Sequence, residues 1–75
     1  MKELIEYIAK SLASKPEDVM ITEEITEERV VLRLEVAAED KGKIIGRQGS
    51  VAQAMRVLLR VSAVKNGTRA ILEIV

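Results

Sequence analysis

The sequence contains no cysteine, histidine, tryptophan or phenylalanine, and its single aromatic residue is Tyr7. Without cysteine and histidine, the chain has no disulfide, no thiolate or imidazole metal ligand, and no imidazole base to activate a serine. No apolar run approaches the roughly 20 residues that span a bilayer, and the acidic, amphipathic start of the chain differs from a secretory signal. We therefore expect a cytoplasmic protein that uses no cofactor and no metal.

Paired carboxylates remain as candidates for acid–base or metal chemistry, at Glu23-Glu24 and Glu27-Glu28. Successive residues of a strand point to opposite faces of a sheet, so Glu23 and Glu24 do not converge on one substrate or ion. Glu27 and Glu28 fall in a turn, where acidic residues are ordinary. The sequence thus predicts no catalytic residue, and we expect that the protein is not an enzyme.

Charge is balanced over the whole chain but not between its halves. Residues 1–38 carry nine acidic and five basic side chains, and residues 39–75 carry three acidic and seven basic ones, so the halves stand at −4 and +4. Two interpretations are open: the halves attract each other in the folded protein, or the basic half binds an anionic ligand. A chain of 75 residues predicts one domain over residues 1–75, with a thin core.

Apolar periodicity predicts an α+β fold with six elements. In chain order they are a helix at 2–13, strands at 19–26 and 29–37, a short helix at 38–45, a helix at 51–65 and a strand at 68–75. The two strands at 19–26 and 29–37 are expected to form a hairpin. Pro16 ends the first helix and Asn66-Gly67 ends the long one.

Three of the four glycines, Gly42, Gly46 and Gly49, fall within eight residues. Glycine permits positive φ and the close approach of another chain. We predict that Ser50 is the N-cap of the long helix, whose first amides have no intrahelical partner. Free amides at a helix start bind anions, and a phosphodiester fits such a site. Arg47 would add a charge-assisted contact.

The G-x-x-G spacing alone most often marks a tight turn between two helices. Here a pair of aliphatics precedes it, giving Ile44-Ile45-Gly46-Arg47-Gln48-Gly49, and this resembles the signature of the K-homology (KH) domain. The helix and two strands before the loop resemble the type II arrangement. Over essentially all 75 residues the chain is similar to the small bacterial KhpA-like RNA-binding proteins. The resemblance implies three helices packed on one face of a three-stranded sheet.

The resemblance also implies that the loop clamps the backbone of about four single-stranded nucleotides, with their bases in an apolar groove. The nucleic-acid-binding residues implied are Lys43, Ile45, Gly46, Arg47, Gln48, Gly49, Ser50 and Ala52. In this assignment the loop holds the phosphates, Ile45 and Ala52 line the groove, and Lys43 reaches the same backbone. No aromatic is placed for base stacking, which contributes roughly 1–3 kcal/mol per base. We therefore expect weak, low-specificity binding of single-stranded RNA by each copy.

The helix at 51–65 has more apolar surface than packing against one sheet requires. Its polar strip is narrow, consisting of Gln53, Arg56 and Arg60. Either the first helix covers the excess, or another protein does. The family resemblance implies a homodimer, or a heteromer with a larger KH-containing protein, that acts as an RNA chaperone or post-transcriptional regulator. The alternative function is a degenerate KH fold that serves only as a protein–protein interaction module.

Overall fold

The computed structural model describes all 75 residues. The helices are α1 (Lys2–Leu12), α2 (Lys41–Ile45) and α3 (Ser50–Lys65), and the strands are β1 (Met20–Ile25), β2 (Arg29–Glu35) and β3 (Arg69–Ile74). Short 3-10 turns occupy Pro16–Asp18, Ala38–Asp40 and Arg47–Gly49. The predicted α+β fold and its order of elements are confirmed.

The three strands form one sheet in the order β1-β2-β3. Strands β1 and β2 are antiparallel and form the expected hairpin, with Ile25 opposite Val30. The turn lacks an Asn-Gly pair; instead, the Thr26 hydroxyl accepts a hydrogen bond from the Arg29 amide at 3.1 Å. Strands β2 and β3 are parallel. A parallel pair needs a long crossover, which α2 and α3 provide here.

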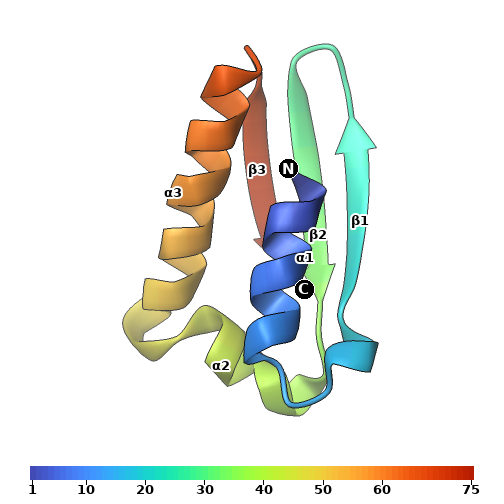
Figure 1. The fold of residues 1–75 in the computed structure, drawn as a ribbon, viewed down its shortest axis with the longest axis vertical. Coiled ribbons are helices and arrows are strands. Elements are labelled where there is room, and N and C mark those ends of the chain that lie inside the picture. The colour runs from blue at the N-terminus through green and yellow to red at the C-terminus, as the bar shows by residue number, and fades with distance from the viewer.

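Helices α1 and α3 lie side by side on one face of the sheet, and α2 lies at one end (Figure 1). The core between these layers contains buried side chains from every helix and from the central strand, including Ile5, Leu32, Leu34, Ile44, Met55 and Leu59. Val31 points to the opposite face, as its position in the alternation predicts. It is nevertheless only 6% exposed, because it sits in the central strand between Glu24 and Ile71.

The end of α3 follows the sequence prediction. Gly67 has φ of 68°, and its amide donates to the Val64 carbonyl at 3.1 Å, while the Thr68 amide donates to the Ala63 carbonyl at 3.0 Å. These two bonds form a Schellman motif, which needs a residue of positive φ after the helix. None of the helices has the length and apolar character needed to cross a membrane.

Candidate nucleic-acid interface

The loop Gly46–Gly49 joins α2 to α3 at one end of the molecule (Figure 1). Gly46 has φ of 79° and ψ of 173°, a backbone conformation that is essentially restricted to glycine. A Cβ added there would lie 2.8 Å from the backbone nitrogen of Val51. Gly46 is therefore required for α3 to start directly against the end of α2.

Gly49 is a different case. It adopts the left-handed helical conformation, with φ of 77° and ψ of 11°, but an added Cβ would meet nothing within 4 Å. The space outside Gly49 is open to an incoming chain. Its neighbour Gln48 also has positive φ, 56°, which costs roughly 1–2 kcal/mol for a residue with a side chain. The loop is thus held in a strained form that turns the Arg47–Gly49 segment outward.

Two amides of the loop are already occupied. The Gly49 amide donates to the Gly46 carbonyl at 3.1 Å, and the Ser50 amide donates to the Arg47 carbonyl. The prediction of free amides at this point is wrong for these two residues, because the loop closes as a 3-10 turn before α3 begins. The prediction that Ser50 is the N-cap is also wrong. Gly49 occupies the cap position, and the helix has no side-chain cap.

The side chains of Arg47 and Gln48 are exposed. Arg47 forms no ion pair, so its guanidinium is available to a ligand. The Ser50 hydroxyl is exposed beside them, at the first position of α3. Both the guanidinium charge and the positive end of the helix dipole favour the binding of an anion at this point.

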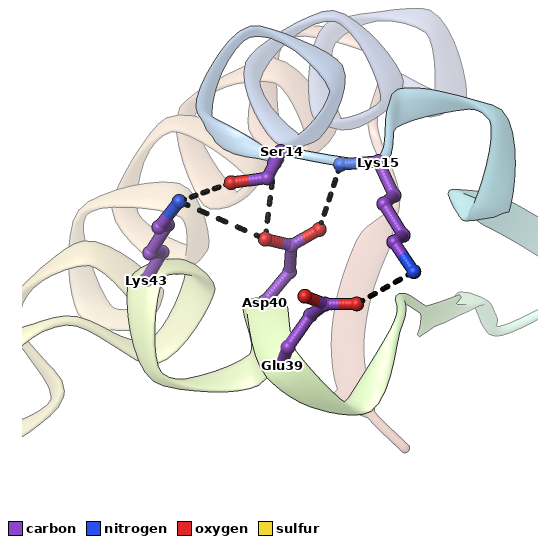
Figure 2. A network of polar contacts seen from close by, with 5 residues as sticks. All are labelled: Ser14, Lys15, Glu39, Asp40 and Lys43. Atoms are coloured by element: carbon purple, nitrogen blue, oxygen red, sulfur yellow. Dashed lines mark hydrogen bonds and ion pairs between the residues drawn. The ribbon is translucent and has the colours of Figure 1, made fainter.

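The Lys43 side chain reaches toward Ser14, in the segment that follows α1 (Figure 2). Its ammonium donates to the Ser14 hydroxyl and lies 3.9 Å from Asp40 Oδ1. Asp40 is only 1% exposed and accepts hydrogen bonds from the amides of Ser14 and Lys15, each at 3.0 Å. These two bonds, with a smaller effect of the Lys43 charge, lower the pKa of Asp40. The network fixes the start of α2, and with it the loop, against the α1–β1 connection.

The two residues expected to line the groove differ in exposure. Ile45 is 40% exposed beside the loop, whereas its neighbour Ile44 is fully buried in the core. Ala52 is only 3% exposed and offers little surface to a ligand.

A groove between α3 and β3 was not predicted from the sequence. It consists of two adjoining cavities, of about 200 and about 370 Å³, that share Arg60, Ala70 and Ile71. Arg56 and Leu59 line the smaller one, and Thr68 and Arg69 line the larger one. The polar strip that carries Arg56 and Arg60 was the available signal. The sequence carried no signal that β3 forms the other side of the groove, because only the parallel crossover places β3 beside α3.

The family model described as "KhpA/KhpB, KH domain" matches residues 2–74. RNA-binding protein KhpA of Clostridium perfringens is 48% identical over 75 residues, covering 100% of both chains. RNA-binding protein KhpA of Treponema pallidum is 46% identical over 74 residues, covering 99% of this chain and 92% of that one. The crystal structure of Aquifex aeolicus Era aligns with a TM-score of 0.64 and 18% identity, over 97% of this chain and 28% of that chain, and supports the fold alone. By its sequence and its type II KH fold, the chain belongs to the KhpA/KhpB family of KH domains.

Proposed function

We propose that this protein binds single-stranded RNA through the loop Gly46–Gly49 and the groove between α3 and β3, weakly and with little sequence preference per copy. The observation that carries the proposal is the exposed guanidinium of Arg47, which forms no ion pair and lies in the same turn as Gly49, where an added Cβ would meet nothing within 4 Å. The relatives named RNA-binding protein KhpA support RNA as the ligand.

The loop holds the sugar-phosphate backbone mainly through side chains, because the amides of Gly49 and Ser50 are engaged. The Arg47 guanidinium forms paired hydrogen bonds with phosphate oxygens, and the Gln48 amide and Ser50 hydroxyl donate without adding charge. The bare surface of Gly49 admits the backbone at close range. Lys43 contributes its charge at longer range, from a side chain that is 55% exposed.

The groove receives the bases. Ala70 and Leu72 of β3, whose side chains lie on the helix-covered face of the sheet, give it an apolar floor, and Arg56 and Arg60 of α3 form its wall. Neither arginine forms an ion pair. Because the groove lacks an aromatic residue, the planar guanidinium groups provide the stacking surface for the bases. Stacking on arginine is tolerant of sequence, so specificity is expected to be low.

A second surface suits a protein partner. The outward face of α3 exposes Val57, Leu58, Val61 and Val64, with exposed fractions of 47%, 47%, 51% and 70%. Helix α1 therefore does not cover the apolar excess of α3. We assign this face to a second copy, or to a larger KH-containing protein. Two linked weak sites multiply the effective affinity without new contacts, which suits an RNA chaperone or post-transcriptional regulator that acts as a dimer.

The double variant Arg47→Asp/Gln48→Asp tests the proposal, since it places two carboxylates where the phosphate is expected. Retention of a labelled oligouridylate is expected to collapse, while circular dichroism and melting temperature stay close to those of the wild type. The control Lys2→Glu/Tyr7→Glu adds the same negative charge on α1, where Tyr7 is 74% exposed, and should retain RNA. If the loop variant binds as well as the control, the protein is a KH fold that serves protein contacts only.

A further inference from the structure

Five of the six arginines have no carboxylate partner. Only Arg33 forms ion pairs, with Glu24 at 3.3 Å and with Glu73 at 3.5 Å. The arginines without a partner are Arg29, Arg47, Arg56, Arg60 and Arg69. Three of them belong to the loop and to the α3 wall of the groove described above. Of the other two, Arg69 lines the far end of the groove and Arg29 lies outside it.

Arg29 and Arg69 are the first residues of β2 and β3, and they are register partners in the parallel ladder. Their side chains therefore leave the same, outer face of the sheet as neighbours. Like charges placed side by side in a sheet are destabilising. On the same face Arg33 and Glu73 are also partners, and there the opposite charges form an ion pair. The outer face thus pairs its charges near one end and places two arginines without an ion-pair partner at the other, where the exposed turn residues Glu27 and Glu28 precede Arg29.

Arg69 connects this pair to the groove. It lines the cavity of about 370 Å³ together with Arg60 and Thr68, at the C-terminal end of α3 and remote from the loop (Figure 1). A polyanion that runs along the groove past Arg60 therefore meets Arg69 next and then Arg29. An acidic protein segment would meet the same charges, but the groove leads an RNA strand directly to the pair.

We propose that Arg29 and Arg69 form a second phosphate-binding site for the same RNA strand. The site takes up the strand where it leaves the groove and carries it around the edge strand β3 onto the outer face of the sheet. This inference rests on the proposed function. A phosphate bound between the two guanidinium groups removes the repulsion between them. A guanidinium binds phosphate strongly because its N–H donors match the geometry of the phosphate oxygens.

The place of the arginine pair makes RNA binding depend on the length of the strand. From Ser50 at the loop to Val64 at the far cavity, α3 rises about 21 Å. A strand of about four nucleotides, the length that a KH loop and groove accommodate, extends from the loop into the groove and ends before the arginine pair at its far end. A longer strand reaches the pair. The two arginines should therefore control how much affinity increases with length, and should not affect a short ligand.

The experiment compares fluorescein-labelled oligouridylates of about four and about twelve nucleotides by anisotropy. The variant Arg29→Gln/Arg69→Gln is expected to bind the short one as the wild type does and the long one several-fold more weakly. Its slope of log affinity against log salt for the long oligonucleotide should become shallower by about 1.4, or about 0.7 for each lost contact. The control Lys10→Gln/Arg33→Gln removes the same charge from residues that already have carboxylate partners and should behave as the wild type.

Unchanged binding of the long oligonucleotide overturns the inference, and so does an equal loss for both lengths or an equal loss in the control. Loss of self-association in sedimentation, with RNA binding intact, would assign the arginines to an acidic surface of a second copy and would also overturn it. The melting temperature of the variant should equal or exceed that of the wild type, because a repulsive pair is removed. The charge-preserving variant Arg29→Lys/Arg69→Lys is expected to keep most of the length dependence. The Arg47→Asp/Gln48→Asp protein separates the two proposals, since failure of that variant to affect either oligonucleotide removes the proposed function itself.

Discussion

The two glycines of the loop are expected to respond very differently to alanine, although both have positive φ. At Gly46 the new Cβ would lie 2.8 Å from the Val51 nitrogen and 2.9 Å from the Val51 Cβ. Backbone strain of about 1–3 kcal/mol and overpacking of about 1–3 kcal/mol act together there. Reduced freedom of the unfolded chain returns about 0.5–1 kcal/mol. We expect Gly46→Ala to lower the free energy of unfolding by about 3 kcal/mol.

At Gly49 the added methyl group meets nothing within 4 Å, so only the backbone strain remains. The expected loss is about 1 kcal/mol after the gain from the unfolded chain. A domain of this size has a total stability of about 4–11 kcal/mol. Since 1 kcal/mol corresponds to about 4–8 °C in such a domain, Gly46→Ala should lower Tm by about 12–24 °C and Gly49→Ala by about 4–8 °C.

Gly67 provides the matched control, because it too has positive φ, 68°, and an added Cβ there has no neighbour within 4 Å. Thermal denaturation followed by circular dichroism should place Gly67→Ala with Gly49→Ala. RNA retention should separate them, since only the methyl group at Gly49 occupies the space where the sugar-phosphate backbone approaches. Equal Tm values for the Gly46 and Gly49 variants would show that the contact with Val51 does not constrain the loop. Equal RNA retention by Gly49→Ala and Gly67→Ala would refute close approach at Gly49.

Two further outcomes are expected. The lowered pKa of Asp40 means that its carboxylate stabilises the fold at pH values above the ordinary aspartate range, and that this contribution is lost as pH falls through the lowered pKa. Denaturant titrations from neutral to acidic pH should show this loss in the wild type. The variant Asp40→Asn should be less stable at neutral pH, and its free energy of unfolding should depend less on pH. A pH profile in the variant equal to that of the wild type would contradict the role of the network. Val61→Glu, at a position 51% exposed, should abolish self-association in sedimentation equilibrium with little change in monomer Tm, and a variant that still dimerises would remove the α3 face from the interface.

What could be predicted from the sequence depended on local signals. The end of α3 at Asn66-Gly67 was predictable because a glycine of positive φ follows the helix, whatever packs around it. The start of α3 was not, because Ser50 resembles an N-cap in sequence, and only the left-handed conformation of Gly49 moves the cap back by one residue. The role of Asp40 could not be found by pattern either. Its hydrogen-bond donors, the amides of Ser14 and Lys15, are 26 and 25 residues away in the chain.

In the candidate site, too, some residues could be placed from the sequence and others could not. The loop residues Arg47 and Gln48 were placed correctly on an exposed turn, since the glycines on either side determine that turn locally. Lys43 was expected to face the same ligand, but the buried carboxylate of Asp40 and the Ser14 hydroxyl hold its ammonium elsewhere. The groove at β3 depends on which strand lies beside α3. That choice follows from tertiary packing, and no spacing in the sequence encodes it.

The balanced net charge of the chain conceals two halves of opposite charge. Of the seven basic residues in 39–75, only Lys43 forms an ion pair, and its partner Asp40 lies in the same half of the chain. The basic residues of 39–75 therefore form no ion pairs with the acidic residues of 1–38. Mutual attraction of the two halves was one of the two interpretations that the sequence left open, and these contacts do not support it. Exposed charges are screened beyond about 10 Å at 0.1 M salt, so a phosphate at the groove responds to the nearby arginines and little to distant glutamates. A protein of zero net charge can in this way present a basic path to RNA while its remaining surface repels it.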